Sequence, residues 1–191
     1  MANKNLFHAG KMISQDVRTY LASAYINSQA GEPIEAPDGG LVELVALHAD
    51  DTYSATGVEY DVYDAQPVNS ANPEKYGDLA FIDYAGVSEG EIAGNEYKVG
   101  IKLYGLKVPA GQITRVRRPA IHDKFWLGAA NFAEDPAIGD EFGIHADEFD
   151  LAKITNAEEH QGFKVKVLLI RELTTGMRDQ GTMALCEVEA L

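Results

Sequence analysis

Apolar and polar residues alternate along much of the chain, and this pattern predicts β-strands. The alternation is clear in residues 97–106 (YKVGIKLYGL) and in residues 163–173 (FKVKVLLIREL), where apolar side chains recur at every second position over most of each segment. A period of two is typical of a strand with one buried face. Residues 182–191 (TMALCEVEAL) follow the loop 174–181, so the last two strands are expected to form a closing hairpin.

Three further segments have the composition of strands, and one segment is ambiguous. Residues 39–49, 58–66 and 78–87 are rich in valine, leucine, isoleucine or tyrosine and lie between turns that contain glycine and proline. Residues 14–27 (SQDVRTYLASAYIN) fit an amphipathic helix as well as a strand. Because this run leads to the turn 37–40 (PDGG) and then to a strand, we favour an opening strand.

The order of these elements predicts a mainly β protein with an antiparallel sandwich or barrel body. No series of alternating strands and helices is present, so a parallel nucleotide-binding sheet is not expected. Residues 1–12 precede the first strand signal and carry little apolar periodicity, which predicts an extended N-terminal arm. Residues 13–111 would form an antiparallel β domain and residues 112–191 a small C-terminal barrel or sandwich. The sequence also allows 13–191 to be a single domain.

Charge is segregated along the chain, whose formal net charge is −14. Residues 31–97 hold fifteen acidic residues and one basic residue, whereas residues 98–124 hold seven basic residues and one acidic residue. Three arginines of the basic segment, Arg115, Arg117 and Arg118, lie in the short stretch TRVRRP. Acidic surfaces repel nucleic acid, so general nucleic-acid binding is disfavoured.

Composition restricts the class of protein further. The chain has 191 residues and one cysteine, Cys186, so no intramolecular disulfide can form and a cysteine-based metal site is not expected. No run of about 18 apolar residues is present, and residues 1–15 lack the long apolar stretch of a secretory signal. We therefore expect a protein that is made in a cytoplasm, is not exported by that route and does not span a membrane.

Motifs for catalysis or metal binding are weak. The sequence has neither a Gly-x-Ser-x-Gly nucleophile turn nor a Gly-rich phosphate loop. The stretches HADD at 48–51 and HADE at 145–148 each place a carboxylate two residues after a histidine, His48 or His145, and two such loops could complete a metal site. Short matches of this kind are expected by chance in a chain with thirty carboxylates. We therefore predict no metal, no cofactor and no catalytic residue, and a buried, inert Cys186.

Several segments together resemble one family. In the N-terminal half they are NLFHAGK, VRTYLASAYIN, GGLVELVAL and YDVYDAQPV, and in the C-terminal half they are RVRRPAIHDKFWLGAANF, PAIGDEFGI, GFKVKVLLIREL and ALCEVEAL. This series resembles the auxiliary proteins of tailed-phage heads, which are also called decoration, cement or minor structural proteins. The long connection 30–40 (AGEPIEAPDGG) departs from the tighter turn expected between the first two strands.

The resemblance implies a non-enzymatic virion structural protein that binds the outer surface of a phage capsid and stabilises it. Its partners would be the major capsid protein and further copies of itself, in a homo-oligomer such as a trimer, with no nucleic acid, membrane or cofactor. The protein would be made in the host cytoplasm and would lie on the capsid surface. The arm would become ordered on a partner. Candidate interface residues are Leu6, Phe7, His8, Arg115, Arg117 and Arg118.

The arginine stretch allows three roles. If residues 112–118 form a strand, Arg115 and Arg117 project from one face and could meet an acidic patch on the capsid protein or on a neighbouring copy. They could instead neutralise carboxylates of residues 31–97 within the same chain, or contact nucleic acid. Two other classes of function also stay open. One is another virion component, such as a head-fibre base or a tail protein that binds host carbohydrate, and the other is a small β-barrel metal protein or enzyme.

Overall fold

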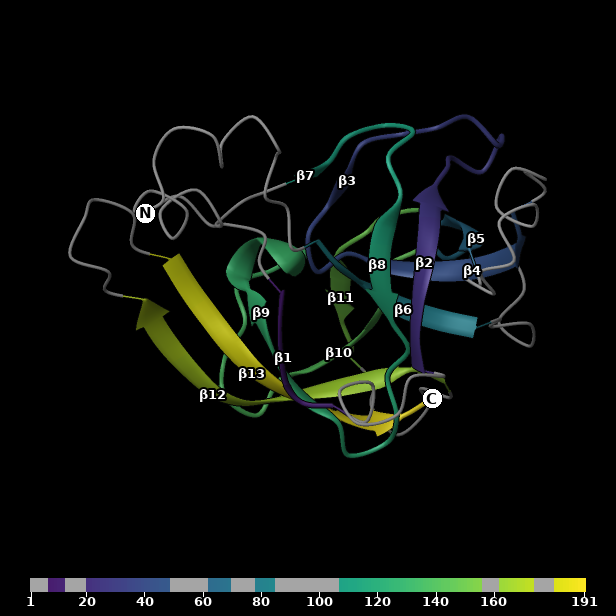
Figure 1. Ribbon diagram of the computed structural model, residues 1–191. Coiled ribbons are helices and arrows are strands. Elements are labelled where there is room, and N and C mark those ends of the chain that lie inside the picture. Colours follow the sequence, from purple (N-terminus) through teal and green to yellow (C-terminus); the bar gives the residue numbers. More distant parts are fainter. Residues whose placement is uncertain are drawn as a thin grey trace, which may run out of the picture.

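The computed structural model describes residues 7–12, 20–48, 62–69, 78–84, 107–155, 162–173 and 181–191. Within these ranges the protein is mainly β, as the sequence predicts, and a short 3-10 helix, η4, lies at Ala129–Asn131 (Figure 1). The strands are β1 Phe7–Lys11, β2 Leu21–Ile26, β3 Ala36–Pro37, β4 Leu41–Leu47, β5 Val62–Gln66, β6 Asp78–Asp83, β7 Lys107–Val108, β8 Thr114–Arg117, β9 Lys124–Gly128, β10 Glu141–Ile144, β11 Leu151–Lys153, β12 Lys164–Leu173 and β13 Gly181–Ala190.

Five strands close into a barrel in the order β2-β5-β4-β6-β8. The pair β2–β5 is parallel, whereas the other neighbouring pairs of the barrel are antiparallel. The barrel prediction is therefore confirmed, with one parallel pair inside a body that was expected to be antiparallel throughout. β8 closes the barrel against β2 and β6, so the barrel takes strands from both sides of the predicted boundary between residues 111 and 112.

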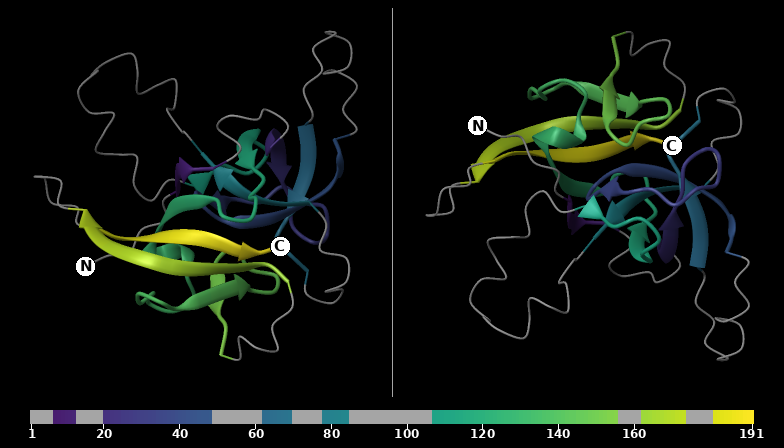
Figure 2. Two further views of the ribbon diagram at one scale, coloured as in Figure 1. Left: turned by 90° about the horizontal axis from the view of Figure 1, so that it is seen from below. Right: turned by 90° about the horizontal axis from the view of Figure 1, so that it is seen from above.

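A six-stranded sheet with the order β1-β9-β13-β12-β10-β11 packs beside the barrel (Figure 2). Its neighbouring strands are antiparallel. β12 and β13 pair from Lys164↔Ala190 to Leu173↔Gly181, which confirms the predicted closing hairpin. The register of this pair shifts at two points. Between Lys164 and Val165 the extra residue lies in β13, and between Val167 and Leu169 it lies in β12. A bulge of this kind increases the local twist of a strand.

The ambiguous segment 14–27 forms a strand where it is described, because β2 occupies Leu21–Ile26. Alternate residues of β2 are buried, as expected for a strand with one face in the barrel. The predicted strand over 97–106 lies outside the described residues. The predicted strands in 39–49, 58–66 and 78–87 correspond to β4, β5 and β6 where the structure describes them.

The second half of the predicted N-terminal arm belongs to the body. Phe7–Lys11 is the edge strand β1, which pairs with β9 through Phe7↔Leu127 and His8↔Trp126. The Phe7 side chain is only 6% exposed and packs in the main core. The prediction of a separate arm is therefore wrong from residue 7 onward, because the burial of one phenylalanine and the pairing with β9 hold this segment on the sheet. Residues 1–6 of the predicted arm lie outside the described residues.

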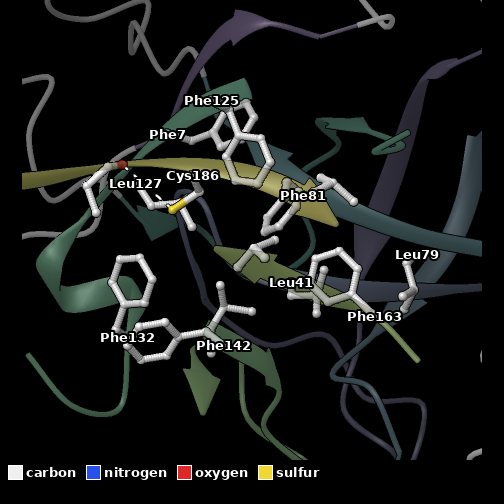
Figure 3. Close-up of a cluster of buried hydrophobic side chains, with 14 of the residues drawn as sticks. Phe7, Leu41, Leu79, Phe81, Phe125, Leu127, Phe132, Phe142, Phe163 and Cys186 are labelled. Atoms are coloured by element: carbon white, nitrogen blue, oxygen red, sulfur yellow. Dashed lines mark hydrogen bonds between the residues drawn. The ribbon is translucent and has the colours of Figure 1, made fainter. Parts of the chain in front are cut away.

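The barrel and the sheet share one core. Its main cluster joins Leu41, Leu79 and Phe81 of the barrel strands to the inner face of the six-stranded sheet. Phe81 stacks on Phe7 with ring centroids 5.7 Å apart and contacts Phe125 at 4.7 Å (Figure 3). Residues from both predicted domains, 13–111 and 112–191, therefore build the same core.

The interior of the barrel forms a second, smaller cluster that is rich in alanine. Buried side chains from the barrel strands and their connections fill it: Ala22, Ala24, Ile26, Ala36, Val42, Leu44, Ala65, Ala80, Ile82, Val108 and Val116. A five-stranded barrel leaves little internal space, so small side chains are needed at many inward positions. β6 separates the two clusters, because Phe81 faces the main core and Ile82 faces the barrel interior.

Candidate functional site

The arginine stretch forms strand β8, on which side chains alternate between the barrel interior and the surface. Thr114 and Val116 are buried, whereas the Arg115 side chain is 41% exposed. Arg115 and Arg117 lie on the same side of the strand, as two residues separated by one must in a pleated sheet. The predicted placement of these two arginines on one face is therefore confirmed.

Both arginines bind a single carboxylate at the end of the neighbouring strand β6. Arg115 Nη2 lies 2.9 Å from Asp83 Oδ2, and Arg117 Nε donates to the same oxygen at 2.5 Å. The Arg117 and Asp83 side chains are only 11% and 13% exposed. Because little water screens this pair, the charge of Asp83 holds the Arg117 guanidinium group in place.

Arg118 is held by a different carboxylate and by an aromatic ring. Its Nε donates to both oxygens of Asp78 at 2.6 Å, and its guanidinium carbon lies 5.0 Å from the centre of the Tyr63 ring. Donation of a hydrogen bond to Asp78 raises the pKa of Arg118, burial lowers it, and a hydrogen bond with Tyr63 raises it further. Arg118 directly follows β8. It therefore links this strand to the start of β6 through Asp78 and to β5 through Tyr63.

These contacts show the internal role, which is one of the three roles that the sequence allowed. Asp78 and Asp83 both belong to the acidic segment 31–97, so the arginines neutralise carboxylates of their own chain. Of the three, Arg115 has the most exposed side chain, against 11% for Arg117 and 17% for Arg118. Any surface role of the stretch falls mainly on Arg115.

Sequence reasoning missed Asp38, which joins the N-terminal strand to the barrel. Its carboxylate accepts the backbone N–H of Phe7 at 3.0 Å and that of Tyr84 at 2.9 Å, and the residue is 4% exposed. Asn131 of η4 donates from Nδ2 to the backbone oxygen of Asp38 at 2.7 Å. The PDGG stretch indicates a turn, but no local signal shows that its aspartate is buried among distant backbone groups.

The buried position of Asp38 changes its acidity. Burial raises the pKa of this carboxyl from 3.8 to about 7, the hydrogen bonds from Tyr84, Phe7 and Gly39 lower it, and the charge of Asp83 raises it. Asp83 itself forms ion pairs with Arg115 and Arg117. The Asp38 carboxyl is thus linked to the arginine stretch through Asp83.

We expect the Asp38→Asn variant to lose a pH dependence of stability that the wild-type protein has. Because the pKa of Asp38 is higher in the folded than in the unfolded protein, its stabilising contribution is complete below about pH 3.8 and is lost as the pH rises through about 7. Urea denaturation of both proteins across this pH window measures the effect. The free energy of unfolding of the wild type should fall relative to that of the variant. A difference that stays constant with pH would contradict the prediction.

The two histidine motifs are described only in part, since residues 49–51 lie outside the described residues. His48 Nδ1 lies 2.8 Å from Asp64 Oδ1, and His145 Nδ1 lies 2.6 Å from Asp150 Oδ1, so each histidine pairs with its own carboxylate. Neither Asp64 nor Asp150 lies two residues after its histidine, where the motif places the carboxylate. Among the described residues, no group of three or more histidine, cysteine, aspartate or glutamate side chains is placed to hold a metal ion.

Cys186 is fully buried in β13, as its apolar surroundings in the sequence predict. Burial raises the pKa of its thiol far above the usual value, which favours the unreactive thiol form. In the part of the chain that the structure describes, no helix has the length and apolar character needed to cross a membrane.

Comparison with protein families, with curated proteins and with solved structures gives no match for this chain.

Proposed function

We propose that the protein is a non-enzymatic structural protein of a phage virion, which binds the outer surface of the capsid and stabilises it. The resemblance to auxiliary head proteins supports the biological setting. The observation that supports a docking surface is the position of Arg115, a half-exposed guanidinium that a buried network holds in one orientation. Its partners would be carboxylates of the major capsid protein.

The chemistry of Arg115 suits a protein interface. A guanidinium group has five N–H donors in a planar fork, and the contact with Asp83 leaves a large part of this side chain at the surface. Asp83 and Arg117 are nearly buried, so they fix the position from which Arg115 projects. An orientation that is fixed before binding lowers the entropic cost of an interface.

The body also has the rigidity that a stabilising protein needs. A closed barrel and a six-stranded sheet share one core, so the surfaces that they carry keep a fixed relation. When many copies of a rigid protein bind a shell at symmetric positions, weak single contacts are strengthened together. The acidic surface elsewhere, within a net charge of −14, favours solubility and disfavours contact with DNA.

The test of this proposal is the copy number of Arg115→Glu on capsids. We expect at least a tenfold loss of affinity, because the change replaces an attraction to acidic groups by repulsion. The free protein should lose only about 1 kcal/mol or less of stability, since water screens the Arg115 side chain, which is 41% exposed. Binding of purified protein to capsids that lack it, followed by quantification of bound chain, measures the effect.

A matched control is Lys107→Glu, which reverses an exposed charge in the same basic segment and pairs with Glu35 in the wild type. This variant should bind capsids as the wild type does. Full occupancy by the Arg115→Glu protein would contradict the docking surface. Location of the protein on the tail of purified particles, rather than on the head, would contradict the capsid role and support the alternative of a carbohydrate-binding tail or fibre component.

A further inference from the structure

The long strand β12 has a partner along only part of one edge. On one side β13 accompanies it from Lys164 to Leu173. On the other side β10 pairs only with Val165 and Lys166, and backbone bonds to Gly139 and Asp140 reach as far as Val167. From residue 168 to residue 173, none of the described segments pairs with this second edge.

Several other strand edges in the described part of the molecule are closed or carry some bonds to other segments. The barrel strands form a closed ring, which has no edge. At one end of the six-stranded sheet, the Phe7 N–H of β1 is bound by the Asp38 carboxylate. At the other end, β11 is bridged by Phe132, and Ala133 N–H donates to the backbone oxygen of Leu151. The open edge of β12 lies on the part of the hairpin that reaches away from the barrel (Figure 1).

The residues of this open edge have the composition of a pairing strand. The sequence 168–173 is LLIREL, with four apolar residues, one arginine and one glutamate. Natural edge strands are protected by charged side chains, proline, β-bulges or a covering segment, because unpaired N–H and C=O groups attract another strand. This edge has Arg171, Glu172 and a bulge at 167–169, but no proline and, among the described residues, no covering segment. Ile170 already packs against the main core, so a strand added here would extend a surface that is partly apolar.

We propose that residues 168–172 of β12 pair antiparallel with the same residues of a second copy of this chain, joining two six-stranded sheets across a two-fold axis. The inference does not depend on the capsid function. A second copy fits this edge because an isologous pair satisfies both open edges at once and needs no third component.

Charge and facing restrict the register of such a pair. Residues directly opposite each other in an antiparallel pair project from the same face of the sheet. The core-facing sides of the two sheets therefore lie on the same side only in every second possible register. A two-fold axis at Ile170 places Ile170 opposite its own copy, Leu169 opposite Arg171, and Leu168 opposite Glu172. A two-fold axis at Arg171 would instead oppose two arginines. The first register avoids opposed like charges, and we assign it to the interface.

Two lysine substitutions at matched positions test the proposal. Leu169 and Leu185 lie directly opposite each other in the hairpin and both are half-buried, but Leu169 lies on the open strand and Leu185 on the inner neighbour. Sedimentation equilibrium of the purified chain should show a dimer for the wild type and for Leu185→Lys. Leu169→Lys should weaken dimerisation at least tenfold, because its lysine would face Arg171 of the second copy. Circular dichroism confirms that each variant is folded.

A cysteine cross-link tests the register. Ile170→Cys should form a disulfide-linked dimer on mild oxidation, because opposite Cβ atoms in paired strands lie at about 4.5–5.5 Å, within small adjustments of disulfide geometry. The native Cys186 is fully buried and does not compete. Ile138→Cys, at a side chain that is 65% exposed, serves as the control and should stay uncross-linked.

Several results would overturn the proposal. A wild-type protein that remains a monomer at high micromolar concentration, or that forms a trimer, has no such two-fold pair. If both lysine variants are monomers, the outer face of the sheet rather than the edge of β12 forms the interface. If both are dimers, the copies meet elsewhere. Failure of Ile170→Cys to cross-link, in a protein that dimerises, would exclude the assigned register.

Discussion

Replacing Phe81 by alanine should lower the free energy of unfolding by about 4–5 kcal/mol, in the upper part of the range for buried phenylalanines. The side chain is fully buried and its ring contacts Phe7, Phe125 and Phe163, with centroids 4.7–5.9 Å apart (Figure 3). The lost ring leaves a cavity between β6 and the six-stranded sheet, and strands on both sides restrict its collapse. The barrel and the sheet should therefore lose stability together.

Chemical denaturation followed by circular dichroism and by the fluorescence of the single tryptophan measures this effect. Trp126 lies on β9 in the sheet, whereas the far-ultraviolet signal reports all strands. Coincident transitions for the two probes would show that barrel and sheet unfold as one unit. Ile138→Ala, at an exposed side chain, is the control and should change stability by less than about 0.5 kcal/mol. A small loss for Phe81→Ala, or two separate transitions in the wild type, would contradict a shared core.

The strands that could be predicted from the sequence are those whose burial alternates over many residues. β12 and β13 each run for ten residues with apolar side chains on the inner face, so periodicity and the intervening loop indicate the hairpin. The four-residue β8 was only a conditional prediction, and the structure forms it with Thr114 and Val116 facing inward between arginines. In these segments the local pattern and the tertiary environment agree.

The N-terminal strand could not be predicted in this way. β1 has five residues, and its first residue, Phe7, is the one that enters the core. A single phenylalanine beside glycine and lysine gives no period to detect. Its place on the sheet depends on β9, which is more than a hundred residues away, and on the N–H bond to Asp38. Such contacts are properties of the fold and leave no local trace in the sequence.

The site was predictable only in outline. Segregation of charge indicated that arginines of 98–124 could neutralise acids of 31–97, but that segment holds fifteen acidic residues and the sequence does not select among them. The register of β6 with β8 makes the selection, since Asp83 lies opposite Arg115 and Phe81 lies opposite Arg117. The burial of Asp38 depends likewise on residues 31 and 46 positions away.

The same register predicts that two neighbouring arginines differ sharply in their effect on stability. Arg117→Glu should lower the free energy of unfolding by about 3–5 kcal/mol, because it leaves Asp83 without its nearly buried partner and adds a second carboxylate beside it. The raised negative charge also acts on Asp38, whose pKa the charge of Asp83 already raises. Both effects therefore weaken the contacts of Asp38 and Asp83, and the Asp38 carboxyl holds β1 to the barrel.

Thermal and urea denaturation of the free protein measure this loss, and Arg115→Glu is the matched comparison on the same face of β8. Both variants change the net charge equally and both face Asp83, but the Arg115 side chain is 41% exposed and the Arg117 side chain 11%. Water screens a charge at position 115 but not at position 117, so only the Arg117→Glu protein should unfold readily. Arg117→Met, which keeps the volume and leaves Asp83 paired with Arg115, should fall between them. Equal small losses for both glutamate variants would show that Asp83 is hydrated and that burial does not set the strength of this pair.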